Sequence, residues 1–133
     1  MYSVTLSHHI LIAHTLAGDV FGPAQRLHGA TLVVEAEFRA PVLDGNDAVC
    51  DMEQALDLVK QACSDFDYRN LDELPEFRGR NTTCEFLAGE LHQRIAVRIR
   101  AGALGPAATE GIAALRIVVR ESPVAWAAFD APL

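Results

Sequence analysis

Two long segments in which apolar and polar residues alternate constrain this chain more than any other feature. In residues 2–14 the apolar side chains recur on even positions, from Tyr2 to Ile12, and in residues 27–40 they recur again from Leu32 to Phe38. Because successive side chains of a strand point to opposite faces, both segments are predicted strands. The His8–His9 pair is a possible bulge in the first one. Residues 15–26, which contain glycines and a proline, form a long loop, and loops of this length between paired strands are typically functional.

The period then changes to that of a helix. Asp51, followed by Gln54, forms a capping-box pattern, and apolar residues at helical spacing predict an amphipathic helix over 52–66. Residues 67–80 are polar and predict an irregular connection. Thr82 or Thr83 is the expected cap of a second helix with Phe86 and Leu91 on its buried face. Glycines and a proline at 102–106 are expected to end that helix.

The last part of the chain returns to strand periodicity. Residues 112–121 alternate, Pro123 interrupts them, and the segment that follows Pro123 predicts a last strand. The order strand-strand-helix-helix-strand-strand predicts an α+β fold, with a four-stranded antiparallel sheet and two helices packed on one face. Long strands at the sheet edges are usually covered or paired, so we expect homo-oligomerisation by sheet extension.

Composition limits the classes of function. The 133 residues suffice for one domain, residues 1–133, and half of them are hydrophobic, which predicts a packed core. The formal net charge of -7 disfavours a nucleic-acid partner. No apolar run is long enough for a membrane span, and the N-terminus lacks the pattern of a signal peptide. Three cysteines without C-x-x-C spacing favour a reducing compartment, so the expected location is cytoplasmic.

Two histidines at the ends of the predicted hairpin form a candidate metal site. His14 ends the first strand and His28 begins the second, so the hairpin brings them together. A catalytic zinc commonly takes three protein ligands, and the third would best stand two residues after His28, on the same face of the strand. That position is Ala30. The alternative is that these histidines are surface or hydrogen-bonded interior residues without a metal.

Three further positions carry possible chemistry. Glu121 continues the apolar parity of the strand over 112–121, and its carboxylate would suit a ligand with two adjacent N–H groups, although an exposed strand-end glutamate has the same pattern. Asp67 and Tyr68 place an acid beside a phenol, which is either a proton relay or a hydrated loop. Cys84, near a helix N-terminus, is either a thiol of lowered pKa or a small buried hydrophobe.

The order and spacing of these pieces resemble the 6-pyruvoyl-tetrahydropterin synthase and 6-carboxy-tetrahydropterin synthase family over essentially the whole chain. Each piece is short, and the resemblance depends on six of them occurring in the family's order. They are IleAlaHis at 12–14, LeuHisGly at 27–29, ValCysAsp at 49–51, PheAspTyrArgAsnLeuAsp at 66–72, AsnThrThrCysGluPheLeuAla at 81–88 and ArgGluSer at 120–122.

The departures from the family pattern concern the chemistry. The family's catalytic cysteine corresponds to Ala24, its third zinc ligand to Ala30 and its catalytic histidine to Tyr68. The family's zinc chemistry and proton transfer both depend on these groups. The resemblance therefore implies that His14 and His28 remain from an incomplete zinc site and that no cofactor is required, with zinc bound weakly or not at all.

The family positions that recognise the pterin ring are retained. The resemblance implies that Glu121 accepts hydrogen bonds from the ring, that Thr83 contacts its other polar edge and that Thr82 assists. It implies a tunnelling fold, assembled as a trimer or hexamer with sites between subunits. The expected function is that of a pterin-binding homologue with altered side-chain chemistry, in which Asp67 and Tyr68 handle protons. The alternative is a non-catalytic regulatory oligomer that binds a pterin or purine-like ligand.

Overall fold

A computed structural model describes residues 1–133 and contains one sheet of five strands. Four strands are antiparallel, β1 (Tyr2–His14), β2 (His28–Ala40), β4 (Ala114–Ser122) and β5 (Ala125–Pro132), whereas the short β3 (Arg69–Asn70) lies parallel to β1. The strand order is β3-β1-β2-β4-β5. The predicted α+β class is confirmed, and the predicted four-stranded antiparallel sheet is corrected to a mixed sheet of five.

The additional strand forms because one backbone hydrogen bond and one side-chain hydrogen bond hold residues 67–70 against the edge of β1. The Tyr68 amide donates to the Leu11 carbonyl oxygen at 2.7 Å, and the Leu11 amide donates to the Asp67 carboxylate at 2.8 Å. A strand of two residues has no periodicity, so its sequence carries no signal for it.

The β1–β2 hairpin pairs without interruption. All 13 residues of β1 have a partner in β2, from Tyr2 opposite Ala40 to His14 opposite His28. The possible bulge at His8–His9 is therefore absent, since both histidines keep the regular alternation. Beyond the ends of the hairpin, the connecting loop contains a 3-10 segment, η1 (Asp19–Gln25).

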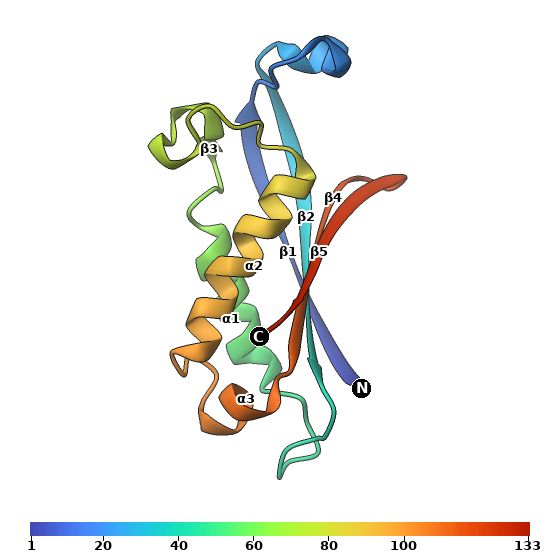
Figure 1. Ribbon diagram of the computed structural model, residues 1–133, viewed down its shortest axis with the longest axis vertical. Coiled ribbons are helices and arrows are strands. Elements are labelled where there is room, and N and C mark those ends of the chain that lie inside the picture. The colour runs from blue at the N-terminus through green and yellow to red at the C-terminus, as the bar shows by residue number, and fades with distance from the viewer.

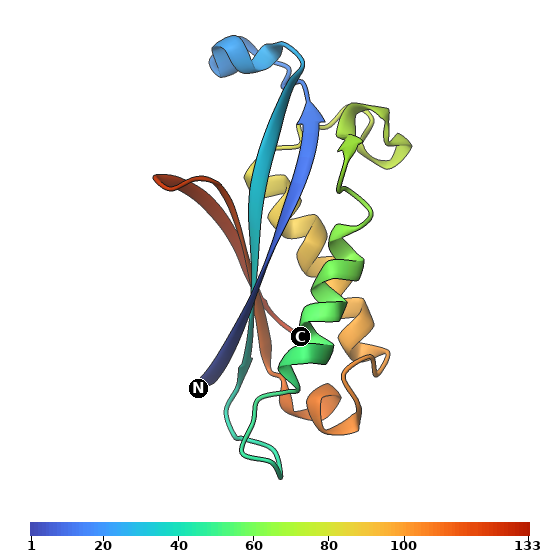
Figure 2. The ribbon, with the colours of Figure 1, turned by 180° about the vertical axis from the view of Figure 1, so that it is seen from behind.

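Helices α1 (Met52–Cys63) and α2 (Cys84–Arg100) lie on the same side of the sheet in both views (Figures 1 and 2). Asp51 caps α1 by accepting from the Gln54 amide at 2.9 Å, and Thr83 rather than Thr82 caps α2 by accepting from the Phe86 amide at 3.2 Å. Helix α1 ends three residues before the predicted boundary. A third helix, α3 (Pro106–Gly111), was not predicted, because its proline and glycines indicated only a turn.

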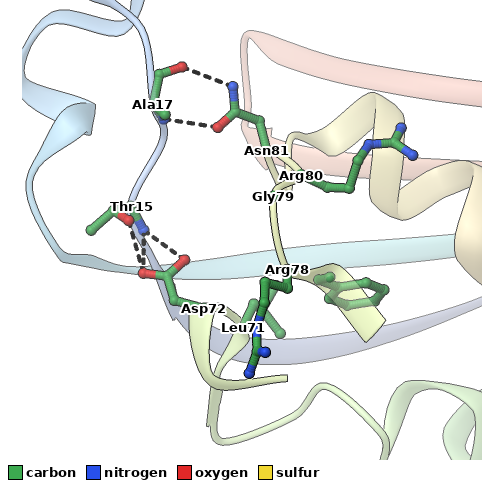
Figure 3. Close-up of a pocket in the computed structure, with 9 residues that line it drawn as sticks. Thr15, Ala17, Leu71, Asp72, Arg78, Gly79, Arg80 and Asn81 are labelled. Carbon is green, nitrogen blue, oxygen red and sulfur yellow. Dashed lines mark hydrogen bonds between the residues drawn. The ribbon is translucent and has the colours of Figure 1, made fainter. Parts of the chain in front are cut away.

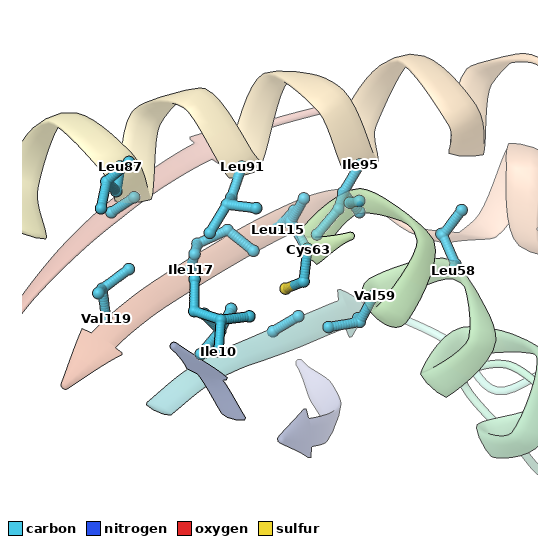
Figure 4. Packing of buried hydrophobic residues seen from close by; sticks show 14 of the residues in the cluster. Ile10, Leu58, Val59, Cys63, Leu87, Leu91, Ile95, Leu115, Ile117 and Val119 are labelled. Atoms are coloured by element: carbon cyan, nitrogen blue, oxygen red, sulfur yellow. The ribbon is translucent and has the colours of Figure 1, made fainter. Parts of the chain in front are cut away.

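The core fills the space between the helices and one face of the sheet (Figure 4). Alternate residues of the strands, such as Ile10 and Ile117, meet Leu91 and Ile95 of α2 and Val59 of α1, and all five side chains are fully buried. Burial of such a side chain contributes about 1.5–3 kcal/mol. The core therefore fixes the N-terminus of α2 over the ends of the strands, where the candidate site lies.

Two 3-10 turns, η2 (Leu71–Glu73) and η3 (Pro75–Phe77), occupy the connection between α1 and α2. No helix combines the length and the apolar character that crossing a lipid bilayer requires.

Candidate functional site

A cavity of about 220 Å³ lies where the N-terminus of α2, the loop with η1 and the ends of β1, β2 and β4 meet. It contains six residues that the sequence marked as candidates, and they come from four separate segments of the chain. These residues are His14, His28, Thr82, Thr83, Cys84 and Glu121.

Glu121 reaches the cavity because the sheet is irregular at its position. The β4–β5 pairing joins Arg120 to Trp126 and Ser122 to Ala125, so Glu121 lies at a bulge without a partner in β5. Bulges of this kind redirect a side chain and are common beside functional sites. In the isolated chain the Glu121 side chain is exposed, and it forms no hydrogen bond or ion pair with another residue. Its two carboxylate oxygens are therefore free to accept hydrogen bonds from a ligand.

The two histidines form a contacting pair at the opposite end of the cavity. Their ring centroids are 4.6 Å apart with an interplanar angle of 60°. His14 Nδ1 lies 3.1 Å from the Thr82 carbonyl oxygen, and His28 Nδ1 lies 2.8 Å from the Arg26 carbonyl oxygen. Burial, followed by the neighbouring His28, lowers the pKa of His14, which favours its neutral form at pH 7.

Two sets of side-chain contacts hold the chain after β1 in place (Figure 3). The Asp72 carboxylate accepts from the Thr15 amide at 3.0 Å and from the Thr15 hydroxyl at 2.9 Å. The Asn81 side chain accepts from the Ala17 amide at 2.8 Å and donates to the Ala17 carbonyl oxygen at 2.9 Å. Thr15, Ala17, Asp72 and Asn81 line a second hollow on the other side of the chain after β1. Residues 14 and 16, which alternate with Thr15 and Ala17, therefore face the cavity.

The start of α2 supplies a second polar wall. Thr82 is buried, and its hydroxyl lies 2.9 Å from His14 Nδ1. The Thr83 hydroxyl accepts from the helix, which leaves its own hydrogen available to a ligand. Burial, with Glu121 as the second cause, raises the pKa of the Cys84 thiol to about 11. The possibility of an activated Cys84 is therefore corrected, because burial and the nearby carboxylate outweigh the effect of the helix N-terminus.

The remaining wall is apolar and small. It contains Leu16, Phe21 and Ala24 from the loop and Ala30 and Leu32 from β2. Sequence reasoning missed Leu16, Phe21 and Leu32 as site residues, and it also missed Glu85, which lines the same cavity. The sequence held a signal for two of these site residues. Leu32 has the same parity as His28 in β2, and Glu85 lies in the first turn of α2.

The residues present do not form a three-ligand zinc site. Ala30 stands two residues after His28 on the same face of β2, where its methyl group cannot ligate a metal. No group of three or more His, Cys, Asp or Glu side chains in the structure is placed to hold a metal ion. His14 and His28 are thus two possible ligands without a third.

Asp67 and Tyr68 do not join this cavity within one chain. They line a separate surface hollow with Arg69 and Asn70, at the outer edge of β1. Tyr68 is 80% exposed and has a φ of 58°, a left-handed conformation that is uncommon for a tyrosine. The structure thus separates the predicted proton-handling pair from the predicted ring-binding residues.

Comparison with known proteins gives a family match over almost the whole chain. The sequence model described as "6-pyruvoyl tetrahydropterin synthase" matches residues 3–132. No curated protein matches the sequence significantly.

Solved structures share the fold at low sequence identity. The 6-pyruvoyl tetrahydropterin synthase of Caenorhabditis elegans has a TM-score of 0.76 at 18% identity, covering 98% of this chain and 97% of that one. The enzyme of the same name from Plasmodium vivax has a TM-score of 0.75 at 14% identity, with both chains covered completely. An uncharacterized protein from Wolinella succinogenes gives 0.65 at 15% identity, covering 96% and 97%. At these identities the likeness establishes the shared tunnelling fold.

Proposed function

Since the chain belongs to the 6-pyruvoyl tetrahydropterin synthase family, we propose that its cavity binds the ring of a pterin or of a related purine-like compound. The observation that carries the proposal is the shared location of Glu121, Thr83 and the histidine pair around one cavity. A carboxylate accepts two parallel hydrogen bonds from adjacent N–H groups, such as the 2-amino group and N3 of a pterin. Glu121 has both oxygens free for this contact.

The two threonines have different proposed roles. Thr83 donates its hydroxyl hydrogen to an acceptor on the other polar edge of the ring, because the oxygen already accepts from the Phe86 amide. Thr82 assists indirectly by holding His14, because both its carbonyl oxygen and its hydroxyl contact the His14 ring. In this arrangement Thr82 positions His14 and Thr83 contacts the ligand.

The proposed side-chain chemistry differs from that of the family. Ala24 and Ala30 lack the thiol and imidazole of the family pattern, so the proposal includes no step that depends on zinc. Asp67 and Tyr68 are proposed to handle protons, and the left-handed backbone at Tyr68 supports a functional role for this exposed residue. Asp67 already accepts from the Leu11 amide, which holds its carboxylate in place.

A homo-oligomer would bring the two groups of residues together. Residues 2–10 of β1 have no partner on their outer side, and β5 forms the opposite edge of the sheet. Pairing of these edges between subunits would extend the sheet, which supports the proposed trimer or hexamer. The Asp67–Tyr68 pair, at the β1 edge, would then reach a ligand held by a neighbouring subunit.

The proposed partners are a small molecule and further copies of the chain, and not a nucleic acid. The net charge of -7 supports this choice, because it opposes phosphate backbones. The three free cysteines support the cytoplasm as the proposed compartment.

The decisive experiment is calorimetric titration of the protein with pterin and purine ligands. We expect Glu121→Ala to weaken binding by about 10- to 100-fold, the equivalent of losing charge-assisted hydrogen bonds. Glu110→Ala, an exposed carboxylate on the distant α3, is the matched control and should bind like the wild type. Absence of binding by the wild type, or equal affinity of Glu121→Ala, would contradict the proposal.

The alternative is a binding or regulatory oligomer without turnover. It is favoured by the substitution of three chemistry positions in one chain, Ala24, Ala30 and Tyr68. Product analysis after incubation with dihydroneopterin and with its triphosphate distinguishes the two. Turnover that disappears in Tyr68→Phe identifies an enzyme, whereas ligand binding without any product identifies the regulatory alternative.

A further inference from the structure

The connection between α1 and α2, which carries Asp67 and Tyr68, contacts α2 through one arginine, Arg94. We infer that Arg94 is a positioning residue for the Asp67–Tyr68 pair: its guanidinium ties two points of the connection to α2 and so keeps the Tyr68 backbone in place at the edge of β1. The chemical role of the pair rests on the proposed function, whereas its position can be measured without a ligand.

Three carboxylates and one aromatic ring surround the Arg94 guanidinium. Nη1 donates to the Asp65 carboxylate at 2.8 Å. Nη2 lies 3.8 Å from a carboxylate oxygen of Glu76 and 3.8 Å from one of Glu90. The guanidinium carbon lies 4.8 Å from the centroid of the Phe66 ring. These contacts come from the turn after α1, from η3 and from α2 itself, and the two views show the chain passing beside α2 on its way to β3 (Figures 1 and 2).

This set of charges depends on the arginine for its balance. Without the cation, the three carboxylates would face one another as like charges. The Arg94 side chain is only 26% exposed, so water screens these contacts less than it screens an ordinary surface ion pair. Nε is buried and has no partner, so the outer nitrogens make the polar contacts that fix the guanidinium. Removal of Arg94 should therefore release the connection at two points.

Phe66 transmits the position of Arg94 to the pair. Its ring is fully buried, with the Arg94 guanidinium on it and the Phe77 ring 5.4 Å away between centroids. Asp67 and Tyr68 follow Phe66 directly in the chain, so a fixed Phe66 limits where the next two residues can lie.

The backbone at Tyr68 shows why this segment needs support. Its φ of 58° is a left-handed conformation, which costs free energy in a residue with a large side chain and persists only where the surroundings determine it. On one side the Tyr68 amide donates to the Leu11 carbonyl oxygen at 2.7 Å, and the Asp67 carboxylate accepts from the Leu11 amide. Arg94 supports the segment from the other side.

Arg98 provides a matched control on the same helix. It lies one turn after Arg94, is also partly buried and forms no ion pair. Its Nη1 donates to the Arg94 carbonyl oxygen at 3.1 Å, a contact within α2. Loss of Arg98 therefore removes an arginine from α2 without releasing the connection.

The test is amide hydrogen exchange, measured by NMR on the full chain without a ligand. Exchange of the Tyr68 amide requires local opening of the segment from β1, whereas the core amides of β2 report global unfolding. We expect Arg94→Met to lower the protection of the Tyr68 amide roughly tenfold relative to the β2 amides, because charge-assisted contacts are lost. Arg98→Met should leave this ratio unchanged. Arg94→Lys should give an intermediate value, because lysine keeps the charge but not the planar fork.

A second variant removes the shortest of these contacts from the other partner. Asp65→Asn keeps the shape of the side chain and leaves α2 intact, so it should lower the protection of the Tyr68 amide in the same direction as Arg94→Met. Asp57→Asn, an exposed carboxylate of α1, is its control. If Arg94→Met does not fold, the comparison of Asp65→Asn with Asp57→Asn decides.

The outcomes separate this inference from the proposed function. Equal relative protection of Tyr68 in the wild type and in both variants, Arg94→Met and Asp65→Asn, overturns the inference, whether or not a pterin binds. Loss of that protection in a protein that binds no pterin contradicts the proposed function and leaves the positional contact standing. In a protein that forms product, Arg94→Met should lower kcat with unchanged affinity for the pterin, since Glu121 lies in another cavity. An unchanged kcat with a released Tyr68 would overturn the functional role of Arg94.

Discussion

His14 and Thr82, which are 68 positions apart in the sequence, are joined by two contacts of the His14 Nδ1 atom, at 3.1 Å to the Thr82 carbonyl oxygen and 2.9 Å to its hydroxyl. This connection links the last residue of β1 to the residue before the Thr83 cap of α2. Both residues are buried, so the contacts are shielded from water. The cavity walls are therefore held in place by the fold itself, before any ligand binds.

The caps of the two long helices provide a matched pair of variants. Thr83→Ala and Asp51→Ala each remove a side chain that accepts from a first-turn amide, so each should lower the free energy of unfolding by about 1 kcal/mol. Only Thr83 lines the cavity, so only Thr83→Ala should also weaken ligand binding. Urea denaturation and calorimetry measure the two effects. Equal loss of affinity in both variants would mean that Thr83 acts through stability alone.

Asp72 should stabilise the chain segment behind the cavity. Asp72→Ala removes the acceptors of the Thr15 amide and hydroxyl, and should reduce the free energy of unfolding by about 1–3 kcal/mol. Glu73→Ala is the control, because Glu73 follows Asp72 in the chain and its own carboxylate is exposed and makes no hydrogen bond. Similar denaturation midpoints for the two variants would show that the Asp72 contacts do not hold the segment.

Stability should decrease at alkaline pH because of Cys63. Burial, followed by the nearby Asp67, raises the pKa of the Cys63 thiol from 9.0 to about 12. The native thiol therefore keeps its proton while the unfolded one loses it, so its contribution is complete below pH 9 and is lost as pH rises toward 12. By pH 10.5 the loss is about 2 kcal/mol. Denaturation of wild type and Cys63→Ala at pH 8 and pH 10.5 measures it, and an equal change in both proteins would exclude Cys63 as the cause.

Zinc binding should depend on position 30. The wild type offers His14 and His28 without a third ligand, so we expect well under one zinc per chain after dialysis. Ala30→His adds an imidazole on the same face of β2 and should raise the content toward one zinc per chain. Thr31→His, on the opposite face, is the control and should not change it. One tightly held zinc per wild-type chain would show that another ligand replaces the missing imidazole.

Much of the fold could be predicted because local periodicity reports which side of each element is buried. The strand over residues 2–14 was predicted with the bounds that β1 has, the cap of α1 was identified as Asp51, and the cap of α2 was narrowed to Thr82 or Thr83. The two-residue β3 and the short α3 could not be predicted, because neither is long enough to show a period. The end of α1 was placed three residues too far for a related reason, since Phe66 is buried in the turn that follows the helix.

The sequence predicted which residues belong to the candidate site better than it predicted which of them lie around one cavity. Glu121 and the histidines were identified from parity and position, whereas the resemblance implied sites between subunits, and within one chain Asp67 and Tyr68 lie at another edge of the sheet. That separation depends on where the chain after α1 pairs with β1, a contact between residues that are distant in sequence.

The sequence by itself determined the alternation of strands, the helix starts and the family to which the chain belongs, because each depends on residues that are close together or on their order. Only the tertiary structure decided which polar side chains surround one cavity, that Glu121 lies at a bulge of the sheet, and that Nδ1 of each histidine contacts a backbone carbonyl oxygen. These properties arise from hydrogen bonds and packing between segments tens of residues apart, and local sequence patterns do not encode them.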